Sequence, residues 1–301
     1  MKKKNIFVLA MLAAVVAVAI VVTMIYVNTN EETKQSDDLS IVTSFYPMYV
    51  ATANIVDGVD GVTLQNLSEP QTGCLHDYQL TTADMKLLST ADIFVVNGGG
   101  IESFLTDIAS DYPKLSMVEA CSNLTLLTEE DEENAHAWMS IAAYRNQVSA
   151  IAGQLANLDA PHAEQYEENV KTYDAKLAKL QEEQEAIREC TDGQNVILFH
   201  EAYAYVAEDY GLNVTYVLDL DEERAVSAGE RADVLDSIQN DRVSYILAEE
   251  RYGSKTGDAV EAEANVKVIY LDACNRGEYD KDSYLTAMQS NIDMLRAAFC
   301  N

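Results

Sequence analysis

Basic side chains are scarce in this sequence. It has 20 lysine and arginine residues against 50 aspartate and glutamate residues, a formal net charge of -30 at pH 7. A surface with such an excess of negative charge repels nucleic acids and anionic lipids, and it concentrates cations nearby. We therefore exclude nucleic acid as a partner. The charge is explained either by solubility or by a cation-collecting role.

The first 27 residues lack acidic side chains, and an uncharged apolar run from Ile6 to Val27 follows three lysines. As a helix this run would be about 33 Å long, enough to cross a bilayer core of about 30 Å. The lysines should stay in the cytoplasm, which places the rest of the chain outside it. No A-x-A-like site follows the run, and no cysteine precedes Cys74 to accept a lipid. We therefore favour a signal anchor over a cleaved signal peptide for residues 1–27, followed by a polar linker at 28–38.

The cysteines form no C-x-x-C pair, so the sequence indicates no cysteine-based zinc site. An odd number of cysteines in an exported chain predicts that at least one is not paired within the chain. The pairing of the others is left open. The five are Cys74, Cys121, Cys190, Cys274 and Cys300.

Short β-branched runs alternate with helical patterns along the rest of the chain. This alternation is typical of an α/β fold with a largely parallel sheet. Half of the runs fall in residues 39–160 and half in residues 191–301, so we predict two α/β lobes of similar make-up. The runs cover residues 40–45, 62–67, 92–98, 114–119, 195–200, 214–219, 243–249 and 266–272.

Residues 161–190 are predicted to form one long helix that links the lobes. Apolar side chains recur mostly every three or four residues from Ala163 to Ile187, and Pro161 suits a first helical turn. The helix would be about 45 Å long, enough to run along both lobes. A coiled-coil partner helix is the weaker alternative, because the segment has few heptads and no clear charge pattern.

Three of the four histidines lie at the ends or edges of predicted strands. His76 lies in a loop after the second strand, His136 follows an acidic run, and His200 ends a strand. Asp272 ends another strand, at the edge where open parallel sheets bind ligands. Three imidazoles and one carboxylate suit tetrahedral zinc, whereas manganese prefers more oxygen. Because no local motif joins these residues, a structural role for each histidine stays open.

The chain contains several segments whose order is typical of one protein family. They resemble segments of the zinc- and manganese-binding solute-binding proteins of ABC importers. The resemblance implies metal ligands at His76, His136, His200 and Asp272, in a cleft between two α/β lobes joined by one rigid helix. His162 matches no ligand position, and we expect it to be exposed at a helix start. The segments are "TSFYPMYVATANIVDG" (43–58), "HDYQLTTADMKLLSTADIFVVNGGGIESFL" (76–105), "HAWMS" (136–140), "FHEAYAYVAEDYGL" (199–212) and "LDACNRGEYDKDSYLTAMQSNIDML" (271–295).

The resemblance implies a membrane-tethered extracytoplasmic receptor that captures Zn²⁺ and delivers it to an ABC permease. Manganese is the alternative metal. Members specialised for manganese often have glutamate at the third ligand position, where this chain has His200, so zinc is favoured. Binding requires deprotonated imidazoles, and the affinity is therefore expected to fall below about pH 6.5.

Other functions were weighed against this one. An extracytoplasmic zinc hydrolase would need an open metal position and a general base, for which Glu201 is the candidate. Four protein ligands leave no such position, and strand neighbours such as His200 and Glu201 point to opposite faces. We therefore predict that the chain is not an enzyme, while an adhesin or a sensor on the same scaffold stays open.

The chain departs from the family around its first two expected ligands. Leu75 and Ala135 replace the usual prolines, so we expect these loops to be more mobile when empty. Acidic residues fill positions 129–133, where many zinc-binding members carry a histidine-rich loop. We favour a solvated loop there over a weak cation-collecting lip.

Cys74 and Cys274 each lie two residues from an expected ligand. If those ligands bind one ion, the two thiols could form a disulfide across the cleft, which requires Cα atoms within about 7 Å. Separate thiols are the favoured alternative. Metal binding by Cys74 itself is not expected, because His76, so close in sequence, would have to share the same ion.

Overall fold

The computed structural model describes residues 38–76, 78–129, 132–220 and 224–300. The predicted signal anchor and nearly all of the predicted linker lie outside the described residues. Within the described part of the chain, no helix has the length and apolar character needed to cross a bilayer. The chain divides after Leu39, and Ser40–Asn301 form one structural unit.

The N-terminal lobe is built on a four-stranded sheet. Its strands are β1 (Leu39–Thr43), β2 (Val62–Asn66), β3 (Ile93–Val96) and β4 (Ser116–Glu119), in the spatial order β2-β1-β3-β4. β3 pairs in parallel with both β1 and β4. All four of its residues are apolar and buried, as expected for a central strand covered on both faces. The helices of this lobe are α2 (Tyr46–Ile55), α3 (Thr82–Leu88) and α4 (Leu105–Asp111).

The C-terminal lobe repeats this plan with a second four-stranded sheet. Its strands are β7 (Asn195–Leu198), β8 (Asn213–Val217), β9 (Tyr245–Ala248) and β10 (Lys267–Tyr270), in the order β10-β9-β7-β8. β7 pairs in parallel with β8 and β9, and β9 with β10. The buried core of this lobe includes Ile197, Ile246 and Val260. Its connecting helices are α8 (Tyr203–Tyr210), α9 (Ala228–Asp241) and α10 (Glu250–Glu263).

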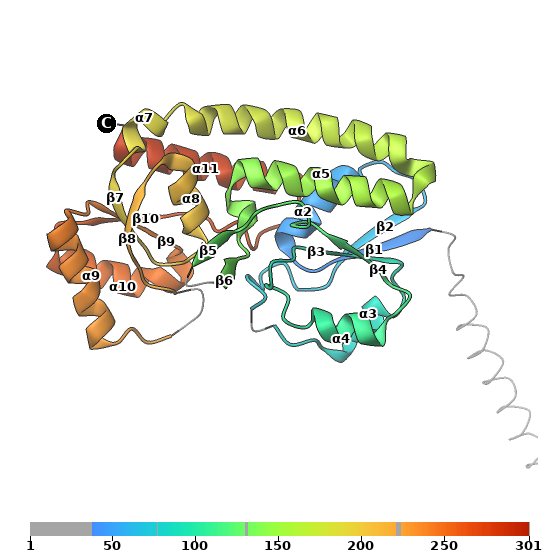
Figure 1. Cartoon of the computed structure of the whole chain (residues 1–301), viewed down its shortest axis with the longest axis horizontal. Helices are drawn as coiled ribbons and strands as arrows, with labels where there is room; N and C mark the ends of the chain where they lie inside the picture. The colour runs from blue at the N-terminus through green and yellow to red at the C-terminus, as the bar shows by residue number, and fades with distance from the viewer. Residues whose placement is uncertain (1–37, 77, 130–131, 221–223, 301) are drawn as a thin grey trace, which may run out of the picture. The chain divides into compact units, whose positions relative to one another are not determined.

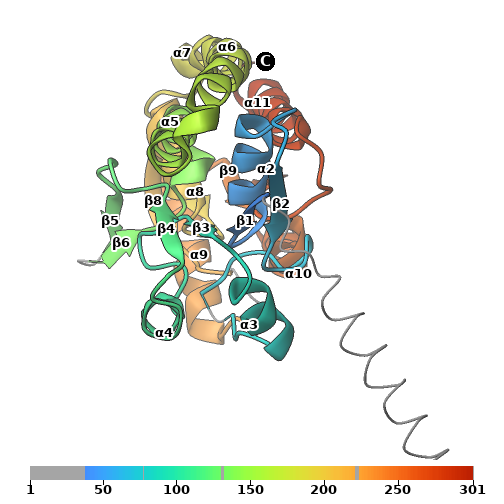
Figure 2. The same cartoon turned by 90° about the vertical axis from the view of Figure 1, so that its right-hand side faces the viewer.

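A long helix, α6 (Ala163–Glu185), packs against elements of both lobes. It contacts α2 and α5 (Ile141–Leu158) on the N-terminal side and α11 (Ser283–Phe299) on the C-terminal side. Figures 1 and 2 both show α5 and α6 side by side. The predicted apolar stripe is its buried face, with Tyr166, Tyr173, Leu177 and Leu180.

The α/β fold class with two parallel sheets and a long helix is confirmed. Every predicted strand forms, although most are shorter than the apolar runs that indicated them. The long helix is also shorter than residues 161–190, because Ala160–His162, with Pro161, form a separate 3₁₀ turn. After Glu185 the chain continues into a short helix, α7 (Arg188–Thr191).

Two features were not predicted from the sequence. Part of the acidic run forms an antiparallel hairpin of β5 (Leu127–Glu129) and β6 (Glu132–Asn134), with residues 130–131 outside the described residues. A disulfide joins Cys190 in α7 to Cys300 after α11, and the two cysteines are 110 residues apart in the sequence. This disulfide therefore ties the end of the long-helix region to the last helix.

Candidate metal centre

The first segment of the site is the loop that follows β2. Leu75 is fully buried and accepts a backbone hydrogen bond from Tyr78 in a tight turn, so it anchors the loop. Cys74 and His76 lie on either side of this anchor. Gly73 has φ +92°, and a Cβ atom there would lie 2.5 Å from Arg276 Nη2. Glycine at this position therefore lets the loop lie close to the C-terminal lobe.

The second segment places His136 directly after the β5–β6 hairpin. The His136 side chain is 0% exposed, and its Nδ1 lies 2.9 Å from Asn134 Oδ1. An amide oxygen only accepts hydrogen bonds, so we assign the ring proton to Nδ1, which leaves the lone pair of Nε2 for a metal. Asn134 in turn donates to the carbonyl of Glu201 and accepts a hydrogen bond from the Tyr205 hydroxyl. The C-terminal lobe thus fixes the orientation of His136.

The third segment lies beyond the carboxyl end of β7. His200 is 0% exposed, and neither of its ring nitrogens has a hydrogen-bond partner among the described residues. Its Nδ1 lies 3.8 Å from Glu249 Oε2, and Arg276 Nη2 lies 3.2 Å from the other oxygen of that carboxylate. A carboxylate beside a histidine is the usual outer partner of a metal-binding imidazole.

The three predicted histidines come together in space. His76 Nε2 lies 3.4 Å from His136 Nε2, and the ring centroids of His136 and His200 are 5.0 Å apart. Two groups of three ligand atoms arise around His136, each with all atoms within 4.8 Å of one another. We call the group of Cys74, His136 and His200 the inner group, in which both histidines are buried and Cys74 is half-buried. The group of His76, His136 and Glu201 is the outer group.

Asp272 belongs to neither group. It lies two residues beyond the end of β10, and its Oδ1 accepts a hydrogen bond from the backbone N–H of Cys274 at 2.7 Å. Its own N–H donates to Asn291 Oδ1 at 2.8 Å. The structure therefore brings the three histidines together but not Asp272, and all four ligand assignments stay predictions.

The two buried histidines are neutral at ordinary pH. Burial, followed by the neighbouring histidines, lowers the pKa of His136 well below its usual value. Burial, followed by the charges of His76 and Arg276, lowers the pKa of His200 to about 3. A neutral imidazole is the form that binds a metal, and both rings are already in that form.

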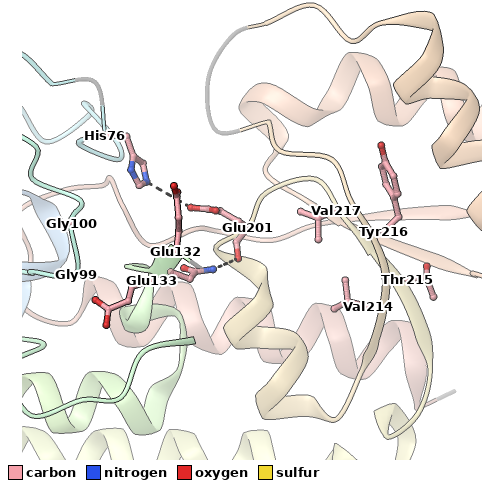
Figure 3. A pocket seen from close by; sticks show the side chains of 11 residues that line it. His76, Gly99, Gly100, Glu132, Glu133, Glu201, Val214, Thr215, Tyr216 and Val217 are labelled. Atoms are coloured by element: carbon pink, nitrogen blue, oxygen red, sulfur yellow. Dashed lines mark hydrogen bonds and ion pairs between the residues drawn. The ribbon is translucent and has the colours of Figure 1, made fainter. Parts of the chain in front are cut away.

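A pocket of about 1140 Å³ opens beside the outer group. His76 and Glu133 line it from the N-terminal side, and Glu201 and residues 214–217 of β8 line it from the C-terminal side. In Figure 3 the His76 ring and the Glu201 carboxylate point toward each other, and their closest atoms are 4.0 Å apart. The exposed fraction is 34% for the His76 side chain and 31% for the Glu201 side chain. Two of the three side chains of the outer group are therefore reached by solvent from this pocket.

Trp138 lies behind His136, with 5.0 Å between the ring centroids. It is fully buried and is the single tryptophan of the chain. The Trp138 Nε1–H donates to the carbonyl of Ala273 at 2.9 Å, and the backbone carbonyl of Trp138 accepts a hydrogen bond from the Tyr284 hydroxyl at 2.7 Å. This side chain joins the segment after the hairpin to the C-terminal lobe.

Two residues of the groups were not expected as ligands. The alternation argument about Glu201 was wrong, because β7 already ends at Leu198 and residues 200 and 201 lie in a turn. Cys74 was not expected to bind the metal, yet its Sγ lies 3.6 Å from His136 Nε2. The disulfide between Cys74 and Cys274 is not formed, and both residues are thiols. The Cys274 thiol instead donates a hydrogen bond to the carbonyl of Asp272 at 3.8 Å.

Comparison with known proteins gives a consistent picture. The profile of a family described as "Zinc-uptake complex component A periplasmic" matches residues 41–298. The "High-affinity zinc uptake system protein ZnuA" of Bacillus subtilis (strain 168) is 28% identical over 293 residues, covering 89% of this chain and 91% of that protein. The "Manganese-binding lipoprotein MntA" of Halalkalibacterium halodurans is 25% identical over 277 residues, covering 87% and 90%.

Solved structures share the same fold. The structure of the "SBP FpvC in complex with Ni2+ ion" from Pseudomonas aeruginosa has a TM-score of 0.77 and 28% identity, and the similarity covers 87% of this chain and 97% of that one. Some relatives are much longer. The "Zinc-binding protein AdcA" of Streptococcus pyogenes is 26% identical over 291 residues, and the chain spans only 55% of its length.

Proposed function

Because this chain belongs to the family of zinc-uptake complex component A, the metal-binding solute-binding proteins of ABC importers, we propose that it captures Zn²⁺ outside the cytoplasm and delivers it to an ABC permease. The observation that carries the proposal is the convergence of His76, His136 and His200 beside a pocket. Members of this family bind a solute and are not enzymes. The prediction that the chain is not an enzyme is therefore confirmed, and the hydrolase interpretation is set aside.

Zinc is proposed on the basis of the ligand types. Imidazole nitrogen suits Zn²⁺, whereas Mn²⁺ prefers carboxylate, carbonyl and water oxygen. Manganese is the second candidate, and the observation in its favour is the Glu201 carboxylate, an oxygen ligand that belongs to the outer group with His76 and His136. Asp272 remains the proposed fourth ligand, as one further oxygen.

The exposed and buried parts of the site suggest an order of binding. His76 and Glu201 are the partly exposed members and line the pocket, so they meet an incoming cation first. His136 belongs to both groups and holds the ion as it reaches the buried side. The acidic residues Glu132 and Glu133 are exposed and line this pocket; their position gives the cation-collecting role, the less favoured interpretation of the sequence, a place in the proposal.

The proposal is tested by titrating the full-length, metal-stripped chain with Zn²⁺ and with Mn²⁺ against a competing chelator. We expect one tightly bound Zn²⁺ per chain. His136→Ala should lower the Zn²⁺ affinity at least about 100-fold, because replacing even a residue that only hydrogen-bonds to a metal ligand lowers the affinity about 10–100-fold. His162→Ala is the matched control, because His162 lies outside the site and contacts Asp159 at 2.7 Å. No bound metal, or equal affinity for the two variants, would overturn the proposal. Tighter binding of Mn²⁺ than of Zn²⁺ would replace zinc by manganese.

The organisation of the chain outside the site is also proposed. We propose that residues 1–27 anchor the protein in the membrane and that residues 28–38 are a linker. The proposed lobes are residues 39–160 and 191–301, joined by 161–190. The intact mass of the protein purified from membranes tests the anchor, since a chain shortened by about the first 27 residues would identify a cleaved signal peptide instead.

A further inference from the structure

The Cys74 thiol faces the metal centre although no motif of the sequence marked it as a ligand. Its Sγ lies 3.6 Å from His136 Nε2, the ring nitrogen left available by the hydrogen bond to Asn134. Together with one nitrogen of His200 these atoms form the inner group, within 4.8 Å of one another. A metal ion bound at about 2.0–2.3 Å from each atom fits a group of that size after small side-chain movements.

His200 independently indicates that the inner group binds a ligand. Its ring is fully buried, and neither nitrogen has a hydrogen-bond partner among the described residues. Leaving such a buried polar group without a partner destabilises the fold. A cation in the inner group would satisfy one ring nitrogen, and the Glu249 carboxylate, 3.8 Å from Nδ1, lies where it can accept a hydrogen bond from the other.

The surroundings of the sulfur suit a thiolate. Asn275 Nδ2 donates a hydrogen bond to Cys74 Sγ at 3.1 Å, and a sulfur with negative charge is the better acceptor. Arg276 lies against Gly73, the residue before the thiol, and its guanidinium adds positive charge nearby. These groups stabilise the charge that remains on sulfur when the thiol proton leaves.

We propose that Cys74 is a metal ligand and that, with His136 and His200, it selects thiophilic divalent cations, Zn²⁺ above Mn²⁺. This inference rests on the proposed function, which it deepens. On binding, the S–H bond breaks, the sulfur lone pair forms the bond to the metal, and the proton passes to water. His76 is not a member of the inner group, so Cys74 and His76 do not have to approach the ion from neighbouring backbone positions.

The test is the X-ray absorption spectrum of the full-length chain loaded with one equivalent of Zn²⁺. We expect one sulfur neighbour at about 2.3 Å together with nitrogen or oxygen neighbours at about 2.0–2.1 Å. The sulfur neighbour should disappear in Cys74→Ser. The ratio of Zn²⁺ to Mn²⁺ affinity should also fall at least about tenfold, the smallest loss usual when a residue that only hydrogen-bonds to a metal ligand is replaced. Cys121→Ser is the matched control, because that thiol also accepts a hydrogen bond from an amide, Gln147 Nε2 at 3.2 Å.

The outcomes separate the two proposals. Bound Zn²⁺ without a sulfur neighbour would overturn the role of Cys74 and leave the zinc receptor intact. Absence of bound Zn²⁺ from the unaltered chain would overturn both. The spectrum of the unaltered chain decides the question by itself if Cys74→Ser does not fold, and a sulfur neighbour that persists in a folded Cys74→Ser would refute the assignment.

Discussion

Replacing His200 by leucine should make the metal-free protein resist acid better than the natural sequence. The native pKa of His200 is about 3, whereas a histidine in the unfolded chain titrates near 6.5. As the pH falls below 6.5, the unfolded state gains a proton that the native state does not take up, so stability is lost with falling pH until about pH 3. At pH 5 this amounts to 1.5 pH units at about 1.4 kcal/mol each, or about 2 kcal/mol.

Leucine removes the titrating group and fills a similar buried space. Between pH 7.5 and pH 5 the free energy of unfolding should therefore fall by about 2 kcal/mol less in the variant than in the natural protein. At pH 7.5 we expect it to be at least as stable, because two ring nitrogens without hydrogen-bond partners are removed. Other titrating groups act in both proteins. Among them is Glu102, whose pKa burial raises to about 7; its contribution cancels in the comparison.

The assay is urea unfolding of the chelator-treated protein at pH 7.5, 6 and 5, followed by the fluorescence of Trp138. Ile197→Val is the control, since Ile197 is a fully buried residue of β7 and its truncation should cost about 0.5–1.5 kcal/mol at every pH. If the natural protein and His200→Leu lose the same stability on acidification, His200 accepts a proton in the native state and the reasoning is refuted.

Three further predictions concern the rest of the molecule. Reduction of the disulfide between Cys190 and Cys300, which closes a loop of about 110 residues, should lower the free energy of unfolding by about 4 kcal/mol; equal urea midpoints with and without reductant would contradict this. Gly73→Ala should cost about 1–3 kcal/mol in the same assay, because φ is +92° and the new Cβ meets Arg276, and an unchanged midpoint would show that the loop adapts. The emission of Trp138 should change when Zn²⁺ is added, because its ring lies 5.0 Å from that of a proposed ligand; a titration without any spectral change would argue against metal binding beside it.

The affinity of the buried ligands should also survive acid better than their residue types alone predict. The sequence led us to expect weaker binding below about pH 6.5, the ordinary value for histidine. Burial lowers the pKa of both His136 and His200, so protons compete with the metal at these two rings only at lower pH. This difference arises from tertiary packing, which local sequence patterns do not describe.

Much of the fold could be predicted because its signals are local. The β-branched runs marked every strand of the two four-stranded sheets, and the rule that parallel sheets bind ligands beyond their carboxyl ends placed His200 near the centre. The exact ends of the strands were not predicted. β7 ends at Leu198, two residues earlier than expected, and this alone changes where Glu201 points.

The rest of the site depends on contacts between distant segments. Cys74 meets His136 only because a loop after β2 lies against the end of the β5–β6 hairpin, 62 residues further along the chain. The pair Cys190 and Cys300 depends likewise on how α7 meets the end of α11. Nothing in the local sequence around these cysteines distinguishes the paired ones from Cys121 or Cys274, so their chemistry became visible only in three dimensions.

The position of Trp138 has a consequence for how cargo leaves. Its indole packs against the ring of His136 and is held to the C-terminal lobe through its hydrogen bond to Ala273. The pocket beside the outer group is lined by the partly exposed side chains of His76 and Glu201, so we expect a departing ion to pass the same side chains that admitted it. We therefore expect the protein to bind and release its ion through the same opening, at His76 and Glu201. It should not pass ions through the molecule from one face to the other.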